Sequence, residues 1–319
     1  GMRTCAGQKG HCGRPTCPIC YTFGSVSERG SFSGVVSICD ARILLFPVYS
    51  MAGPVWVTSP SVLRDYGVSD QSVAEDRAKW GNGITTRAHL NLGWLMVARD
   101  SSSDFQIGLP PEIPDDIRSR VVLVSDKLFS IVVNSNLEVR TSVSINPETG
   151  AAEEGALFTY EAIPRATVLW MEVVVDDFRG EFPSMSRLNE WEEQLRTISD
   201  SKNRLKRWGL WDESRDDQAL DEACRKAIGW VRESQQKYQE SGVSWTYPDH
   251  VVVAGLEWAE HLGIGGMGTR GFGRIRYLRP KDSGASDTLR EVQDGSASVS
   301  NHQSGPAGDS KGSIDHRRS

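Results

Sequence analysis

The chain has 319 residues, 38% of them hydrophobic, which suits one large domain or two ordinary ones with a buried core. Its 36 Lys and Arg residues and 42 Asp and Glu residues leave a formal net charge of −6, so a nucleic-acid site would require a local basic groove. No run approaches the roughly 18 consecutive apolar residues of a membrane helix, and the first residues lack the apolar segment of a signal peptide. We therefore expect a cytoplasmic protein.

The first cluster along the chain consists of cysteines. Residues 1–34 are rich in Gly and Cys and predict a loop that a bound group holds together. Crowded thiols in a cytosolic protein bind metal more often than they form disulfides, and thiolates in tetrahedral geometry favour zinc. We predict one structural zinc ion held by Cys5, Cys12, Cys17 and Cys20, with His11 as an alternative ligand.

Two other interpretations of these cysteines stay open, namely free thiols, or a disulfide if the protein is not cytosolic. A redox role for the Cys17-Pro18-Ile19-Cys20 motif is disfavoured, because such a motif must follow a strand and open a helix. Here Pro15 and Pro18 predict that the motif lies within a loop. A zinc ion closed by four protein ligands leaves no open position for catalysis.

The middle of the chain predicts an antiparallel sheet. Short apolar or β-branched runs indicate strands at residues 43–48, 55–58, 121–124, 130–133, 137–144 and 167–175. A short helix is predicted at residues 61–66, after Pro60, and a turn at residues 146–150.

The second half of the chain is mainly helical. Apolar residues recur at helical spacing over about 186–240, which indicates a helical insertion in an α+β fold. A short helix at 256–262 and a strand at 274–278 are predicted to end the folded part, near residue 280. Residues 281–319 are rich in Ser and Gly and contain no aromatic residue, so we predict a disordered tail.

A run of basic and aromatic residues lies within the predicted insertion. Such a mixture can hold single-stranded nucleic acid, but it is also typical of a solvated helix end. We favour the second interpretation, with the neighbouring Glu190, Glu192 and Glu193 as partners for the basic side chains. The run comprises Lys202, Arg204, Lys206, Arg207, Trp208 and Trp211.

A glycine-rich loop at residues 265–274 is the most informative segment. It contains a G-x-G-x-x-G match, but a helix is predicted before it and a strand after it, which is the reverse of a dinucleotide site. Its five glycines would let backbone amides approach phosphates, and we expect Gly268 to need a positive φ. Arg270 and Arg274 add positive charge, and Phe272 offers a face on which a base can stack. The alternative is a simple turn.

Several segments resemble motifs of one protein family. Residues 1–3 resemble the end of an SSLKGxxR motif, and residues 17–24 resemble a CxxCxxFG zinc loop. Residues 37–48 are similar to an SDARLLLFPV strand, and residues 57–60 to a VTCP turn, with Ser59 in place of Cys. With the glycine loop, these ordered matches resemble the RAMP superfamily backbone subunits of type III CRISPR effector complexes.

The resemblance implies a ferredoxin-like or RRM-like RAMP core over residues 1–280. Such a subunit would bind CRISPR RNA and target RNA without sequence preference, beside copies of itself or other RAMP subunits. A thumb-like hairpin would interrupt the guide–target duplex. The RNA-binding residues would be Arg3, Gly265, Gly266, Gly268, Thr269, Arg270, Gly271, Phe272, Gly273 and Arg274.

The resemblance also implies that this chain begins inside the SSLKGxxR motif. The family's first strand, most of its first helix and the Asp that assists target-RNA cleavage precede that motif, so we expect them to be missing and expect no nuclease activity. Asp40 belongs to a different motif and does not inherit that role. Two alternatives stay open: a metal-dependent endoribonuclease subunit once the missing segment is supplied, and an unrelated hydrolase.

Overall fold

The computed structural model of the chain describes residues 10–27, 30–68, 71–86, 88–100, 105 and 107–279. The chain divides into two units, Gly1–Tyr277 and Leu278–Ser319. The fold described here is that of the first unit, because nearly all of the second lies outside the described ranges. The predicted disordered tail at 281–319 lies outside them too.

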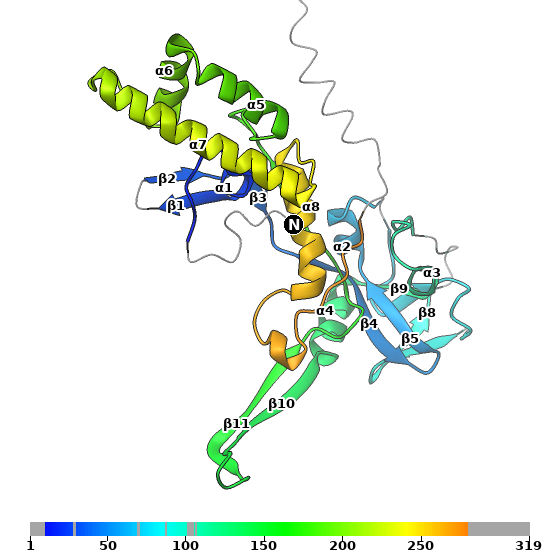
Figure 1. The fold of residues 1–319 in the computed structure, drawn as a ribbon. Helices are drawn as coiled ribbons and strands as arrows, with labels where there is room; N and C mark the ends of the chain where they lie inside the picture. The colour runs from blue at the N-terminus through cyan, green and yellow to red at the C-terminus, as the bar shows by residue number, and fades with distance from the viewer. Residues whose placement is uncertain are drawn as a thin grey trace, which may run out of the picture. The chain divides into compact units, whose positions relative to one another are not determined.

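The first unit combines helices and strands, which confirms the α+β class (Figure 1). The described elements, in chain order, are α1 (Pro18–Phe23), β1 (Gly24–Ser27), β2 (Gly30–Ser33), β3 (Val36–Ile38), β4 (Arg42–Ser50), β5 (Gly53–Thr58), α2 (Pro60–Asp65), β6 (Arg77–Trp80), β7 (His89–Leu92), β8 (Leu95–Arg99), α3 (Asp115–Arg118), β9 (Val121–Val124), α4 (Asp126–Ser135), β10 (Glu138–Ile145), β11 (Ala152–Ala162), β12 (Val168–Trp170), β13 (Val173–Val175), α5 (Met185–Gln194), α6 (Ile198–Arg207), α7 (Asp217–Ser241), α8 (Pro248–Leu262) and the 3₁₀ turn η1 (Gly268–Arg270).

A seven-stranded sheet with the order β12-β4-β5-β9-β6-β8-β7 contains most of the strands. The strands β4 and β5 form an antiparallel hairpin, and β5 pairs in parallel with β9, where Val57 lies opposite Val122. All four residues of β9 are buried, as expected for a strand covered on both faces. The strands predicted at 43–48, 55–58 and 121–124 are confirmed. The sheet is mixed rather than antiparallel, because β5–β9 and β6–β8 are parallel pairs.

The strand predicted at residues 130–133 is wrong, because these residues lie within α4. The Ser125 side chain caps this helix by accepting a hydrogen bond from the amide of Leu128. Val132 lies one helical turn after Leu128, and both belong to the core beside the sheet. A short apolar run of this kind fits a strand or a buried helical face equally well, and periodicity alone does not separate the two.

Two further strand predictions require correction. The strand predicted at 167–175 is split: β12 pairs with β4 in the large sheet, whereas β13 pairs with β3 in a separate two-stranded sheet. Residues 274–278 form no strand; instead the amide of Tyr277 donates to the Glu260 carboxylate, at 2.5 Å, on the preceding helix.

The turn predicted at 146–150 joins β10 to β11, a strand that the sequence analysis did not delimit. These two strands pair with each other in a sheet of their own, from Glu138 opposite Ala162 toward the turn (Figure 1).

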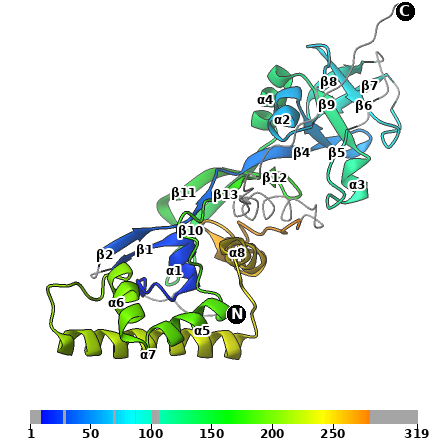
Figure 2. The ribbon, with the colours of Figure 1, turned by 90° about the horizontal axis from the view of Figure 1, so that it is seen from above.

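The helical insertion predicted at about 186–240 is confirmed as α5, α6 and α7. The helices α5 and α6 both pack against α7 (Figure 2), and their facing residues form a core separate from that of the sheet. Gly242 ends α7 in the left-handed conformation that favours glycine. Among the described helices, none combines the length and apolar character needed to cross a membrane. The buried members of the insertion core are Leu188, Trp191, Leu195, Leu205, Trp211, Leu220, Ala223, Ala227, Val231 and Tyr238.

Candidate functional site

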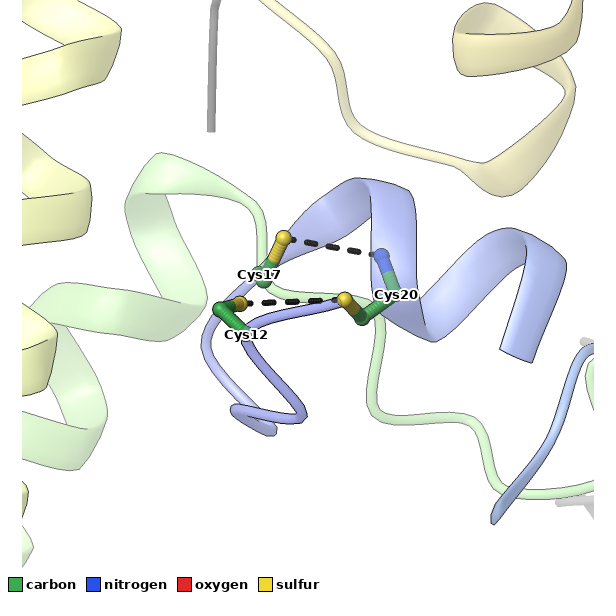
Figure 3. Close-up of side chains that lie close together, drawn as sticks. All are labelled: Cys12, Cys17 and Cys20. Atoms are coloured by element: carbon green, nitrogen blue, oxygen red, sulfur yellow. Dashed lines mark hydrogen bonds between the residues drawn. The ribbon is translucent and has the colours of Figure 1, made fainter. Parts of the chain in front are cut away.

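Three of the predicted metal ligands lie together. The sulfur atoms of Cys12, Cys17 and Cys20 are all within 4.8 Å of one another, and Cys17 and Cys20 are buried (Figure 3). The Cys12 and Cys20 sulfurs are 3.7 Å apart. His11 is exposed and is not part of this group, whereas Cys5 lies outside the described residues. The arrangement is one that can hold a metal ion.

The Cys-x-x-Cys motif opens a helix, so the prediction that it lies within a loop is wrong. Cys17 occupies the N-cap of α1, and its sulfur accepts a hydrogen bond from the amide of Cys20. Pro18 favours this start, because its fixed φ suits the first helical position and its missing N–H would have had no partner there. Gly24 ends the helix with a φ of 81°, and a Cβ there would lie 2.7 Å from the Gly34 nitrogen. The motif therefore requires glycine at its end.

The crowding of the thiols favours the protonated form of Cys20 when no cation is bound. The pKa of Cys20 is raised to about 12, first because of its hydrogen bond with the Cys12 thiol and then because of burial, while the Cys17 thiol acts in the opposite direction. A divalent cation reverses this balance, since it coordinates thiolates and displaces their protons. The donor set of soft, mostly buried sulfurs fits a thiophilic metal.

The glycine loop follows α8 and is closed by a single backbone contact. The amide of Ile264 donates to the carbonyl oxygen of Gly273 at 2.8 Å. Gly265, Gly271 and Gly273 have positive φ angles, whereas Gly268 does not, so the expectation for Gly268 is wrong. Gly268 opens the short 3₁₀ turn, where any residue has an accessible φ.

The loop packs against the β10–β11 hairpin through aromatic and arginine side chains. The Phe272 ring meets the edge of Tyr160, with centroids 5.2 Å apart, and the Arg140 guanidinium lies 5.1 Å from the Phe272 centroid. The Arg270 guanidinium lies 5.2 Å from the centroid of Phe158, which is 44% exposed. Chain segments far apart in sequence thus meet at one partly exposed cluster.

The two predicted arginines of the loop have different surroundings. Arg274 donates to the carbonyl oxygen of His261 at 2.7 Å, near the end of α8, so part of its guanidinium holds the helix terminus. Arg270 is exposed and makes no ion pair with any residue that the structure describes. Arg3, the remaining predicted RNA contact, lies outside the described residues.

Arg140, Phe158 and Tyr160 were missed by the sequence analysis. Phe158 and Tyr160 are two positions apart, and this spacing places them on one face of a strand. Their alternation in a strand opposite Arg140 was the available signal, but nothing in the sequence pairs that strand with the glycine loop.

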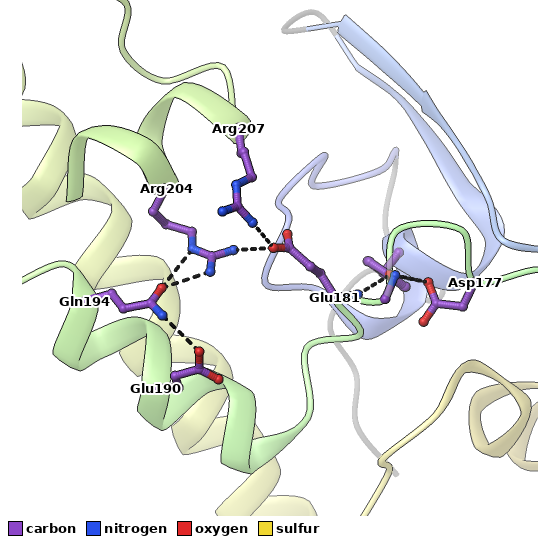
Figure 4. A network of polar contacts seen from close by, with 8 residues as sticks. Asp177, Glu181, Glu190, Gln194, Arg204 and Arg207 are labelled. Carbon is purple, nitrogen blue, oxygen red and sulfur yellow. Dashed lines mark hydrogen bonds and ion pairs between the residues drawn. The ribbon is translucent and has the colours of Figure 1, made fainter. Parts of the chain in front are cut away.

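The basic and aromatic run of α6 is largely used within the fold (Figure 4). Arg204, only 6% exposed, donates to Glu181 at 2.8 Å and to Gln194 at 2.9 Å. Arg207 pairs with the same Glu181 at 2.5 Å. The run does form a helix end, as expected, but Arg204 is buried rather than solvated. The partner of Arg204 and Arg207 is Glu181 rather than the predicted glutamates of α5.

Comparison with known proteins relates these features to a family. The family model of the RAMP superfamily matches residues 2–276, a range that includes the thiol cluster and the glycine loop. The chain belongs to the RAMP superfamily. The resemblance found in its motifs is thereby confirmed.

Individual relatives of this RAMP chain cover only part of it. The CRISPR system Cmr endoribonuclease Cmr4 of Pyrococcus furiosus is 26% identical in an alignment 179 residues long, which covers 48% of this chain and 59% of that protein. The chain thus spans less than two thirds of that relative's length.

Among solved structures, a chain of the type III-B Cmr-beta complex bound to cognate target RNA has 14% identity and a TM-score of 0.41, over 50% of this chain and 63% of that one. Oligomeric Cmr4 from Pyrococcus furiosus has 21% identity and a TM-score of 0.34, over 51% and 65%.

Replacing Gly273 with Ala is expected to open the glycine loop. The new Cβ would lie 1.9 Å from the Ile264 carbonyl oxygen, and Ala disfavours a φ of 71°. Hydrogen–deuterium exchange at the Ile264 amide should accelerate about tenfold or more, because its hydrogen bond is lost. Gly268→Ala is the matched control, since nothing lies within 4 Å of its Cβ. Equal exchange in both variants would contradict the role given to the closing contact.

Proposed function

We propose that this chain is an RNA-binding backbone subunit of a type III CRISPR effector complex, holding CRISPR RNA and target RNA. The observation that carries the proposal is the joint surface of the glycine loop and the β10–β11 hairpin, which combines exposed backbone, free positive charge and aromatic rings. Membership of the RAMP superfamily and the partial match to Cmr4 support it.

The glycine loop would bind phosphates. The amides of Gly265 and Gly266 make no backbone hydrogen bond within the described part of the chain, and no side chain lies near either Cα. Phosphate oxygens can therefore approach these donors, and the exposed Arg270 adds a charge-assisted contact. Contacts of this kind position an RNA strand without reading its bases.

The hairpin would supply stacking. Phe158 and Tyr160 present adjacent rings, with centroids 5.8 Å apart, beside the Arg270 guanidinium. Aromatic rings and guanidinium planes accept any base, so this surface suits sequence-tolerant recognition of a single strand. Phe272, expected from sequence to stack on a base, already contacts Arg140 and Tyr160, so it would mainly support the other two rings.

The subunit would act in an assembly with copies of itself or other RAMP subunits along the guide. A ferredoxin-like core within the seven-stranded sheet is part of the proposal. It is supported by the parallel pairing of β5 with β9, which follow one another across a connection that contains α2, β6, β7, β8 and α3, and by β4 pairing antiparallel to β5.

We further propose that the thiol cluster binds one structural zinc ion through Cys12, Cys17 and Cys20, with Cys5 as the fourth ligand. Zinc–sulfur bonds of about 2.3 Å in a tetrahedral site place neighbouring sulfurs roughly 3.8 Å apart. The separation of 3.7 Å between the Cys12 and Cys20 sulfurs agrees with that value, and it is far from the roughly 2.05 Å of a disulfide. Zinc would supply only cross-linking of the loop.

RNA titrations test the RNA-binding proposal. Single-stranded RNA of unrelated sequences should bind with similar affinity, and the Kd should rise steeply with salt as neutralised phosphates release counterions. Arg270→Ala should raise the Kd about 10- to 150-fold, the equivalent of one charge-assisted hydrogen bond. Fluorescence polarisation at two salt concentrations measures both effects.

Arg225→Ala serves as the control for this titration, because Arg225 is an exposed arginine paired with Asp221 on α7. An unchanged Kd for Arg270→Ala, or an equal loss for both variants, would exclude the glycine loop as the RNA contact. Gel analysis of the RNA after each titration reports whether the chain cleaves it.

Elemental analysis tests the zinc proposal. Chain purified without chelator should contain about one equivalent of zinc, as a closed structural site requires. Replacing both Cys17 and Cys20 with Ser should remove the metal, because serine hydroxyls are poor zinc ligands at neutral pH. Cys39→Ser should retain it, since Cys39 is exposed and outside the cluster. Metal-free wild-type chain with reactive thiols would refute the site.

A further inference from the structure

The segment that contains the three clustered thiols, residues 12–20, also contacts the helical insertion. We call this segment the thiol loop. Between Cys12 and Cys17 it has no helix or strand, and the residues there contact α7, the longest helix of the insertion.

A buried pair of hydroxyl groups forms the first contact. The Thr16 hydroxyl donates to the carbonyl oxygen of Trp230 at 3.4 Å, and the Ser234 hydroxyl donates to the Thr16 oxygen at 3.1 Å. Thr16 is fully buried and Ser234 is 6% exposed. Separating them without access to water would leave a buried polar group unsatisfied, which is costly. This contact therefore depends on the position of the thiol loop.

An ion pair forms the second contact. Arg14 pairs with Glu233 on α7, and its guanidinium lies 5.6 Å from the centroid of Trp230. The pKa of the Glu233 carboxyl is lowered, first by the Lys237 ammonium and also by Arg14. Arg14 and Thr16 thus contact adjacent residues of α7, Glu233 and Ser234.

The thiol loop ends within α1, and this helix is fixed to the segment that leads into the insertion. The Tyr21 hydroxyl is hydrogen-bonded to Asp177 and accepts from the amide of Glu181 at 2.9 Å. Arg179 lies 4.4 Å from the Tyr21 centroid and donates to the Tyr21 carbonyl oxygen at 3.0 Å. The loop is therefore held in place at α1, while the portion before α1 contacts α7.

We propose that Arg14 and Thr16 are positioning residues that dock α7 on the thiol loop, so that metal occupancy of the cysteine cluster controls docking of the helical insertion. The inference rests on the proposed zinc site. The portion from Cys12 to Cys17 contains one turn, in which the Cys17 amide donates to the Arg14 carbonyl oxygen at 3.1 Å, but no helix or strand. Bonds from the Cys12 and Cys17 sulfurs to a metal ion would therefore fix both of its ends. Without the ion, Arg14 and Thr16 lose their fixed positions, and Glu233 and Ser234 lose these partners.

Hydrogen–deuterium exchange on the full chain tests this coupling. Removing zinc with a chelator should accelerate exchange about tenfold in the part of α7 around residues 230–238, together with residues 12–24. Restoring zinc should reverse it. Exchange in the β10–β11 hairpin should not change, because its two strands form a sheet of their own and pack against the glycine loop.

A substitution separates docking from metal binding. Thr16→Val preserves the shape of the side chain and removes the hydroxyl, so the variant should keep its zinc equivalent while α7 exchanges faster. Thr141→Val is the matched control, since Thr141 is an exposed hairpin residue that shares a 3.5 Å hydroxyl contact with Thr159. It should leave exchange in α7 unchanged.

The outcomes distinguish the two proposals. A chain that binds zinc, releases it to chelator and keeps the same protection in α7 overturns the coupling while leaving the metal site intact. A chain that never binds zinc overturns both. If chelation accelerates exchange in α7 but the zinc-bound Thr16→Val variant exchanges at the wild-type rate, the role of Thr16 is overturned.

Discussion

The hydrogen bond from the Ile264 amide to the Gly273 carbonyl closes the glycine loop, and the candidate RNA surface depends on it. The approach is so close that only glycine fits at position 273. Closure places Phe272 against Tyr160 and Arg270 against Phe158, so that the loop and the hairpin form one surface. Arg274 also supports the closed loop, because it donates a hydrogen bond to a carbonyl oxygen near the end of α8. Backbone amides of the loop, the exposed Arg270 guanidinium and aromatic rings are then presented together, an arrangement that suits a sequence-tolerant RNA site.

The thiol loop is held in place mainly by contacts with other parts of the chain. It contacts α7 of the helical insertion, but the buried cluster around its cysteines is small and comprises Cys12, Cys17, Cys20, Ile19 and Phe32. Thr16 and Arg14 of the loop contact α7, and Tyr21, which follows the loop within α1, contacts Asp177 and Arg179. A cross-link through sulfur would hold such a segment without a hydrophobic core, which is the usual role of structural zinc. The acidic net charge is compatible with an RNA function, because many basic side chains, such as Arg204 and Arg207, are paired internally and the RNA surface needs only a few free ones.

Sequence reasoning succeeded where one local pattern decides the structure. Residues 43–48, 55–58 and 121–124 are strongly β-forming and became strands, and the apolar spacing of 186–240 indicated helices that exist. It failed where local patterns are ambiguous. Residues 130–133 fit a strand but form part of α4. Pro18 was interpreted as part of a loop, but it opens α1. It also failed for contacts between distant segments. Arg270 was identified, but its partner Phe158 was not, because the docking of the glycine loop on the hairpin is a property of the tertiary fold. Likewise the cysteine spacing pointed to a metal site, whereas the contacts of Thr16 with α7 carry no local signal.

Photo-crosslinking of the full chain to single-stranded RNA that contains 4-thiouridine tests the central claim most directly. Mass spectrometry of the crosslinked peptides locates the RNA on the chain without assuming which residues bind it. Adducts are expected in the hairpin near residues 158–160 and in the loop at residues 263–276, with a yield that falls as salt rises. Adducts confined to residues 202–211 of the helical insertion, with none in the loop or the hairpin, would contradict it.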